Sequence, residues 1–427
     1  MKPIVKLDRM LVAVEVDQTV HMMLELVAPP APVVTRRPID VVAVIDRSGS
    51  MGGAPLASVL AATSLLARLL GSDDRMAVVT FDDKVDLVLP LGHHSAHTAD
   101  QVLGRVHCGG STNLSGGWLK GMEVLSAHGR PDAVKRVLVL TDGRANVGLT
   151  DADVLCSLTG SARAQSITTT MVGFGDGYDE RLIAAMADAG GGNDYWCAGA
   201  DNAATVFADE FQGLMSVVAQ NISVEIRPTD PTAGFAVLNE FPIADVPGGL
   251  QVALGDAYGD ERRRVIAVFE VKALAAPGPW HVAELVIRWA STVGEVALHT
   301  VTVPVMVGAA DAALADAMQP DPDVVEQVNV LKVAKLRKEA FEAEREGRRS
   351  DAVSALRNAA PAMRATAASP SEIAELDDDI ARLTRGDWHE ADMKRQYSTM
   401  RGVNRSRKAR YDESDFNTSG SGKGPAR

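Results

Sequence analysis

The sequence predicts an α/β fold in which a doubly wound, mainly parallel sheet is inserted into a β-sandwich and followed by a C-terminal helical segment. Between residues 39 and 220, short apolar runs alternate with segments of helical spacing, which is typical of parallel strands joined by crossover helices. Strand-like runs separated by turn residues fill 221–309, as in a β-sandwich. Similar runs within 1–38 need a sheet to join, and the simplest expectation is that they pair with this second region.

The amino-acid composition argues against two classes of function, nucleic-acid binding and membrane spanning. The chain has 427 residues, with 43 Lys and Arg against 56 Asp and Glu, a net charge of −13, and only 4% aromatic residues. Phosphate contacts need clustered cations and single strands need stacking surfaces, so we expect no nucleic-acid partner. The sequence lacks a run of about 20 apolar residues, so we expect no membrane span.

Two further observations concern the compartment. Cys108, Cys156 and Cys197 are far apart and fit neither a disulfide framework nor a metal knuckle, which indicates a reducing environment. The N-terminal residues carry charges at Lys6, Asp8 and Arg9 and lack the apolar core of a signal peptide. We therefore expect a cytoplasmic protein.

The expected elements of the α/β domain, residues 39–220, follow one another in order. Strands are expected where short apolar runs occur that are too short for helices, near 41–45, 75–81, 85–89, 136–141 and 167–174. Helices are expected where apolar residues recur at helical spacing, near 56–70, 98–105, 113–128, 151–165, 178–188 and 201–220.

The C-terminal part changes texture again. Residues 310–396 are expected to be helical, with an antiparallel hairpin broken at Gly347 and a third helix over 371–386. Residues 397–427 are rich in Ser, Gly, Arg and Lys, and we expect them to be disordered.

The most informative segment for function is Asp46-Arg47-Ser48-Gly49-Ser50, which comes directly after the strand expected at 41–45. In an open α/β sheet, ligands bind beyond the carboxyl ends of the strands, where the strand order reverses. Asp46, Ser48 and Ser50 offer one carboxylate and two hydroxyls on a tight turn. These are hard oxygen donors, which suit Mg²⁺ or Mn²⁺ rather than a soft metal.

Two more loops offer oxygen donors at corresponding places. Thr112 lies in the Gly-rich stretch 109–113 before a helix, and Asp142 follows the strand expected at 136–141. Two carboxylates balance the charge of one divalent cation, and Mg²⁺ prefers about six oxygen ligands. A coordination position would then remain for water or for a partner's carboxylate.

The motifs DRSGSMGG, GGSTNLSGG and TDGRANVG resemble, in this order, the three parts of the metal-ion-dependent adhesion site of von Willebrand factor A (VWA) domains. GFGDGYDERLIAAMADAGGGNDYW resembles the last third of that domain in bacterial members, so the resemblance spans about 39–219. It implies a doubly wound sheet with one antiparallel edge strand. It also implies a Mg²⁺ site (or Mn²⁺ or Ca²⁺) whose ligands are Asp46, Ser48, Ser50, Thr112 and Asp142.

Two details of the resemblance matter below. Ser111 stands where many members have the loop Thr, so Ser111 is the alternative ligand to Thr112. The layout of the flanking regions resembles bacterial relatives of inter-alpha-trypsin-inhibitor heavy chains and calcium-activated chloride-channel regulators.

Other interpretations of these residues fit less well. An EF-hand needs Gly and Glu where this chain has Met51 and Ala57, and Tyr178 stands where a dinucleotide-binding fingerprint needs Gly. The histidines at 93, 94 and 97 are expected in an exposed loop rather than at a metal. Asp82 and Asp83 follow the second strand and are expected in a solvated loop, and Cys108 is expected to be buried.

We expect a non-enzymatic adaptor or scaffold protein that recruits an acidic residue of a partner protein through its metal site. One alternative is a metal-dependent hydrolase that activates water, for which His107 is the available base near Asp46 and Thr112. Another is an adaptor subunit for an AAA+ ATPase, a role that some members of the resembled family take. A third is a structural module with an empty or vestigial site.

Overall fold

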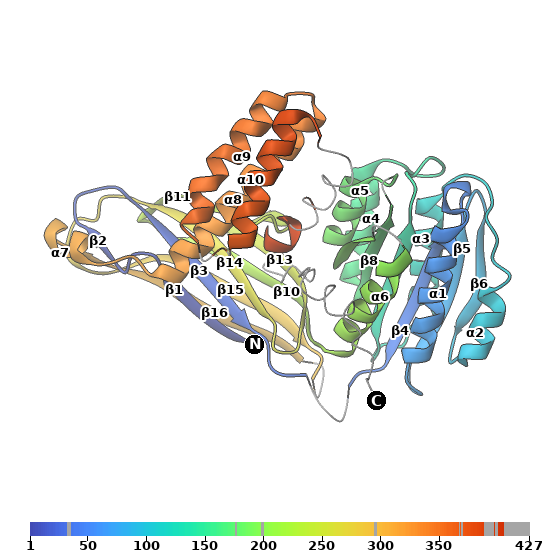
Figure 1. Ribbon diagram of the computed structural model, residues 1–427. Coiled ribbons are helices and arrows are strands. Elements are labelled where there is room, and N and C mark those ends of the chain that lie inside the picture. The colour runs from blue at the N-terminus through green and yellow to red at the C-terminus, as the bar shows by residue number, and fades with distance from the viewer. Residues whose placement is uncertain are drawn as a thin grey trace, which may run out of the picture.

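The computed structural model describes residues 1–31, 36–175, 177–197, 200–293, 297–366, 368, 370–387, 397 and 400–404. Figure 1 shows an α/β domain, a body of two packed sheets and a helical segment that stands on this body beside the α/β domain. Among the described residues, no helix is long and apolar enough to cross a membrane.

The α/β domain is built on a sheet with strand order β6-β5-β4-β7-β8-β9. Its strands are β4 (Ile39–Asp46), β5 (Arg75–Phe81), β6 (Val85–Gly92), β7 (Val134–Thr141), β8 (Ile167–Phe174) and β9 (Gly191–Cys197). β6 is antiparallel to β5 and the other neighbours are parallel, which confirms the predicted doubly wound sheet with one antiparallel edge. The strand order reverses between β4 and β7. β9 was not predicted, because its glycines and polar residues hide the apolar pattern of a strand.

Helices cover both faces of this sheet. They are α1 (Ala54–Leu69), α2 (Ala96–Leu103), α3 (Leu114–His128), α4 (Ala152–Ala164), α5 (Glu180–Ala189) and α6 (Ala200–Met215), with a short 3-10 turn, η1, at Gly49–Met51. One face packs on α1, α2 and α6, and the other packs on α3, α4 and α5. The helix predicted over 201–220 was wrong at its end, because Val217 already pairs with Tyr258 in a strand.

The two-sheet body comprises residues 1–31 and 217–310. One sheet has the order β1-β3-β14-β11 and the other has the order β12-β13-β10-β15-β16-β2. Their bounds are β1 (Lys2–Leu7), β2 (Leu11–Ala13), β3 (Gln18–Val27), β10 (Val217–Pro228), β11 (Thr232–Val237), β12 (Ile243–Val246), β13 (Gly249–Tyr258), β14 (Arg262–Val271), β15 (Gly278–Ser291) and β16 (Ala297–Ala310). Apolar side chains of both sheets form one common core.

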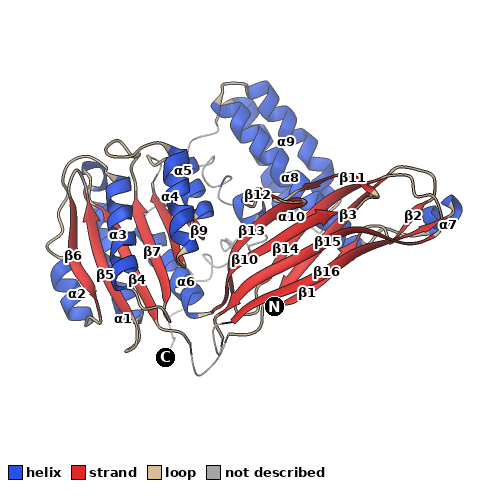
Figure 2. Ribbon diagram, turned by 180° about the vertical axis from the view of Figure 1, so that it is seen from behind, coloured by secondary structure: helices blue, strands red, loops and turns tan. Residues whose placement is uncertain are grey.

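The α/β domain is inserted into this body. β3 pairs with β14 from Gln18 opposite Val271 to Val27 opposite Arg262, and β2 pairs with β16. The N-terminal strands therefore share their sheets with strands that follow the α/β domain in sequence. The chain enters the domain before β4 and leaves it after α6, and both crossings lie at the amino end of the parallel strands (Figure 2).

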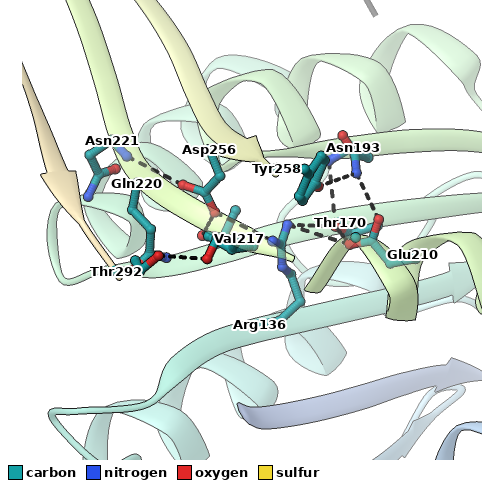
Figure 3. Close-up of polar contacts among 12 residues, drawn as sticks. Arg136, Thr170, Asn193, Glu210, Val217, Gln220, Asn221, Asp256, Tyr258 and Thr292 are labelled. Carbon is teal, nitrogen blue, oxygen red and sulfur yellow. Dashed lines mark hydrogen bonds and ion pairs between the residues drawn. The ribbon is translucent and has the colours of Figure 1, made fainter. Parts of the chain in front are cut away.

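Buried polar groups join the domain to the body at this amino end (Figure 3). Arg136 of β7 is fully buried, and its guanidinium nitrogens lie 3.5 Å from Glu210 of α6 and 3.4 Å from Asp256 of β13. Asn193 of β9 donates to the hydroxyl of Tyr258, also on β13, at 2.9 Å. We call this cluster the seam.

The helical segment consists of α7 (Ala312–Ala317), α8 (Pro322–Arg345), α9 (Arg349–Arg364) and α10 (Pro370–Arg385). α8 and α9 form the predicted hairpin, with Gly347 at a φ of 74° in the turn between them. Val324 and Leu331 of α8 pack against Met23 and Ile266 on the outer face of the four-stranded sheet.

The predicted tail divides into two parts. Residues 405–427 lie outside the described residues. Residues 400–404 are described and helical, and Arg401 is half-buried against the α/β domain, with its guanidinium 2.7 Å from Asp188 and 2.9 Å from Asp194. An ordered contact therefore lies inside the segment that was expected to be disordered from 397, because two acids on another part of the chain compensate this Arg.

Candidate metal centre

The predicted ligands lie at the carboxyl end of the parallel sheet, where its strand order reverses. Asp46 is the last residue of β4, and Asp142 follows the last residue of β7. Because β4 and β7 are neighbouring parallel strands, both aspartates leave the sheet at the same edge. The loop after β4 and the loop before α3 run alongside each other at this edge, since Gly49 N donates to the carbonyl of Gly110 at 3.0 Å.

The first loop folds around the Asp46 carboxylate, which is fully buried. Its Oδ1 accepts a hydrogen bond from the backbone N–H of Ser48 at 2.8 Å, and its Oδ2 accepts one from the Thr141 hydroxyl at 2.5 Å. The Ser48 and Ser50 hydroxyl oxygens are 3.2 Å apart, and the Ser50 hydroxyl donates to Asp142 Oδ1 at 2.8 Å. Hydrogen bonds through Ser48 and Ser50 thus connect the two aspartates.

Thr112 approaches from the Gly-rich loop. It is 3% exposed, and its backbone N–H donates to the Asn146 side chain at 2.9 Å. A Cβ placed on Gly143 would lie 3.0 Å from the Thr112 hydroxyl oxygen and 3.6 Å from Asp46 Oδ2, so both groups border the same small space. Ser111, the alternative ligand, is exposed. The geometry thus favours Thr112 over Ser111.

The electrostatics of the two carboxyl groups indicate a missing positive charge. Burial raises the pKa of Asp46, and the neighbouring Asp142 charge raises it further, although hydrogen bonds from Thr141 and Ser48 oppose this. Burial also raises the pKa of Asp142. Within the described part of the chain, neither carboxylate forms an ion pair with Lys or Arg. The two carboxylates therefore carry negative charge that is not compensated. Together with the three hydroxyls, they form a donor set that fits a hard divalent cation.

The donor set of the candidate centre is rich in hydroxyl groups. Among the described residues, no group of three or more His, Cys, Asp or Glu side chains is placed to hold a metal ion. The candidate centre supplies two carboxylates, and hydroxyls make up the remaining side-chain donors. His94 contacts the Pro90 carbonyl in the loop where it was expected, whereas His97, expected in the same loop, lies in the first turn of α2, where it is exposed and contacts Gln101.

Some predictions about neighbouring residues were wrong. Asp82, expected in a solvated loop, is 5% exposed and forms an ion pair with Arg47 at 3.2 Å. Cys108, expected to be buried, is exposed. The Thr141 hydroxyl was missed as a partner of Asp46. Its position at the strand end, directly before Asp142, was the available signal.

Residues 40–210 match the family described as the von Willebrand factor type A domain. The chain contains a VWA domain. VWA domains are commonly protein-interaction modules and often bind a divalent metal at their metal-ion-dependent adhesion site. The match covers the whole α/β domain up to α6.

Relatives among characterised and uncharacterised proteins share this domain. An uncharacterized protein of Synechocystis sp. is 27% identical over 71% of this chain and 72% of its own length. The E3 ubiquitin-protein ligase WAV3 of Arabidopsis thaliana is 30% identical over 56% of this chain and 32% of its own length. Inter-alpha-trypsin inhibitor heavy chain H1 of Mesocricetus auratus is 24% identical over 52% of this chain and 25% of its own length.

Two solved structures resemble nearly the entire chain. A von Willebrand factor type A protein from Catenulispora acidiphila has a TM-score of 0.73 at 16% identity, covering 93% of this chain and 96% of that one. The ArnB paralog VWA2 from Sulfolobus acidocaldarius has a TM-score of 0.62 at 17% identity, covering 95% and 98%. The likeness shows that the VWA fold and its flanking parts recur together. The cytoplasmic location and the absence of enzymatic activity stay predictions.

Proposed function

We propose that this chain is a protein-binding adaptor whose VWA domain holds a hard divalent cation, Mg²⁺ or else Mn²⁺ or Ca²⁺, to recruit an Asp or Glu side chain of a partner protein. One observation carries the proposal. Asp46 and Asp142 leave neighbouring strand ends, are linked through Ser50, and face no cationic partner among the described residues.

The five residues have different parts in this proposal. Asp46, Ser48 and Thr112 are buried and form the floor of the centre, whereas Ser50 is exposed and Asp142 is half-buried. The centre is therefore open to solvent on the side of Ser50 and Asp142. The bound cation would supply a Lewis-acidic charge that a carboxylate from outside can approach on this side.

The metal part of the proposal is tested on the full-length chain by thermal melting in EDTA and with excess Mg²⁺, Mn²⁺ or Ca²⁺. A ligand that binds only the native state raises the melting temperature. We expect a rise with at least one cation in the wild type and none in Asp142→Ala. A wild-type melting temperature that none of the three cations changes would contradict the proposal.

The recruitment part needs a carboxylate probe. The electron paramagnetic resonance spectrum of Mn²⁺ bound to the chain is expected to change with millimolar Gly-Glu-Gly, acetylated at its N-terminus and amidated at its C-terminus so that the Glu side chain is its one carboxylate. The matched peptide Gly-Gln-Gly should leave it unchanged. A response to both peptides, or to neither, would remove the support for recruitment of an acidic side chain. Capture from lysate in Mg²⁺ and in EDTA then tests for the AAA+ ATPase expected as a possible partner.

A further inference from the structure

Strand β5 ends beside the metal centre, yet none of the five predicted ligands comes from it. Its end nevertheless supports both ligand loops. The carbonyl of Phe81, its last residue, accepts from Arg47 N at 2.8 Å, and the carbonyl of Asp82 accepts from Asn113 N at 3.0 Å. Arg47 lies between Asp46 and Ser48, and Asn113 follows Thr112. Two consecutive carbonyl groups therefore anchor the loops that carry four of the five ligands.

The two loops also hold each other. Gly109 N donates to the Arg47 carbonyl at 2.7 Å, and Gly49 N donates to the Gly110 carbonyl at 3.0 Å. A displacement of either loop therefore displaces the other, and with it Ser48, Ser50 and Thr112.

The Asp82 carboxylate is fixed next to this junction. Its Oδ1 accepts from Lys84 N at 2.7 Å, and its Oδ2 lies 3.2 Å from Arg47 Nε. Arg47 is itself held on its other side by Asp86 at 2.8 Å. Because Asp82 is only 5% exposed and its charge is matched by Arg47, its carboxylate is held in one position.

The Gly-rich loop rests directly on this carboxylate. A Cβ placed on Gly109 would lie 1.8 Å from Asp82 Oδ2, a distance that requires the carboxylate or the loop to move. The neighbouring Gly110 gives a matched contrast. A Cβ there would lie 2.2 Å from Asp83 Oδ1, but Asp83 is exposed, so its side chain has room to turn away.

We propose that Asp82, paired with Arg47, is a positioning residue of the metal centre. It sets the spacing between the loop that carries Ser48 and Ser50 and the loop that carries Thr112, without contacting the cation. The inference rests on the proposed function, because it concerns affinity for the cation at that centre. It assigns a positioning function to the turn that follows β5. The polar sequence of this turn, Asp82-Asp83-Lys84, does not suggest such a function.

The first test measures Mn²⁺ affinity of the purified full chain by electron paramagnetic resonance. Loss of groups that orient metal ligands commonly lowers affinity about 10- to 100-fold. We expect a loss in this range for Asp82→Ala and a smaller loss for Asp82→Asn, which keeps an oxygen for Lys84 N but not the charge that holds Arg47. Melting in EDTA monitors folding separately, so a variant that melts as the wild type does and still loses affinity supports a positioning role.

The second test uses the glycines. Gly109→Ala is expected to weaken Mn²⁺ binding about as much as Asp82→Ala does, and Gly110→Ala is expected to stay within about threefold of the wild type. In the double variant Asp82→Ala/Gly109→Ala the added methyl group has space, so the two losses should not add. The comparison of Gly109→Ala with Gly110→Ala does not involve Asp82→Ala, so it remains decisive if that variant folds poorly.

Two results would overturn the inference. One is wild-type Mn²⁺ affinity in both Asp82→Asn and Gly109→Ala. The other is equal weakening by Gly109→Ala and Gly110→Ala, which would show that any side chain in this loop disturbs binding. A wild-type chain that binds no Mn²⁺ would instead overturn the proposed function itself, so the two failures are distinguishable.

Discussion

Strand β4 carries a fully buried aspartate at each end, and the two have opposite surroundings. Asp40, at the amino end, accepts hydrogen bonds from the guanidinium groups of Arg75 and Arg130, each at 2.6 Å. Burial alone would raise the pKa of Asp40, but these two arginines outweigh it and lower the pKa. Asp46, at the carboxyl end, is bonded by Thr141 and Ser48, and its pKa is raised.

The comparison distinguishes two kinds of buried carboxylate. Asp40 is paired with arginines and stabilises the fold, whereas Asp46 has no cationic partner among the described residues and can bind a cation. At the amino end the seam repeats the pattern of Asp40, because the charge of Arg136 lowers the pKa of Glu210 although burial by itself would raise it. Charges at this end are compensated within the chain. At the carboxyl end, Asp46 and Asp142 carry a charge that the described residues do not compensate, so compensation has to come from outside.

The largest expected effect is at the compensated end. Asp40→Ala leaves two guanidinium groups facing each other, and loss of one partner from a buried ion pair is strongly destabilising. Because Arg75 and Arg130 are partly exposed, we expect a loss of about 2–4 kcal/mol in the free energy of unfolding in EDTA, measured by urea denaturation. The melting response to metal should persist. Unchanged stability would show that the arginines are satisfied by solvent and would remove the contrast.

The opposite behaviour is expected for Asp46→Asn. In EDTA this substitution removes an uncompensated buried charge at constant shape, so stability should stay equal or rise, by at most about 1 kcal/mol. The wild type should gain about 2.7 kcal/mol from a cation at 100 times its dissociation constant, and the variant should gain none. Denaturation with and without Mg²⁺ measures both values. A large loss of stability in EDTA would instead assign Asp46 a structural role like that of Asp40.

The pH dependence of stability in EDTA should have opposite signs at these two positions, because burial raises the pKa of Asp46 whereas Arg75 and Arg130 lower the pKa of Asp40. A raised pKa means that the folded chain binds the proton more tightly, so Asp46 and Asp142 favour folding below about pH 4, and this contribution is lost as pH rises through their raised pKa. Asp40 contributes above about pH 4 and loses this contribution as pH falls through its lowered pKa.

The stability difference between the wild type and Asp46→Asn should therefore shrink as pH falls toward about 4, whereas that of Asp40→Asn should persist into more acidic solution. Urea denaturation at a series of pH values in EDTA checks both curves. Parallel curves for the two variants would mean that the two carboxyls do not differ in their protonation on folding.

The smallest effect is expected at Ser111. Its exposure and the burial of Thr112 favour Thr112 as the hydroxyl donor, so Ser111→Ala should keep Mn²⁺ affinity within about threefold of the wild type. Thr112→Val, which keeps the shape and removes the hydroxyl, is the matched comparison and should weaken binding. A stronger effect of Ser111→Ala would exchange the two assignments.

Much of the fold was predictable because its signals are local. The apolar run at 41–45, too short for a helix, is a buried parallel strand as expected, and β9 was missed because Gly191, Gly192 and Asn193 interrupt any apolar pattern. The five candidate ligands were also local signals, since each stands at a strand end or a helix start.

The interactions around the site were not predictable in this way. Asp82 belongs to a polar triplet that has the composition of a solvated turn, and it is buried because a loop nearly thirty residues later covers it. Arg136 lies in a strand whose partner acids, Glu210 and Asp256, come from a helix and a strand far along the chain. Such pairings depend on tertiary contacts that leave no periodic trace in the sequence.

The two crossings between the body and the VWA domain have a consequence for how this protein can be altered. Both lie at the amino end of the sheet, so the covalent connections to the domain are at one end of it and the ligand loops are at the other. If the VWA domain were exchanged for another VWA domain at these two junctions, the strand order of the two-sheet body would not change. The polar side chains of the seam would then decide which replacements dock.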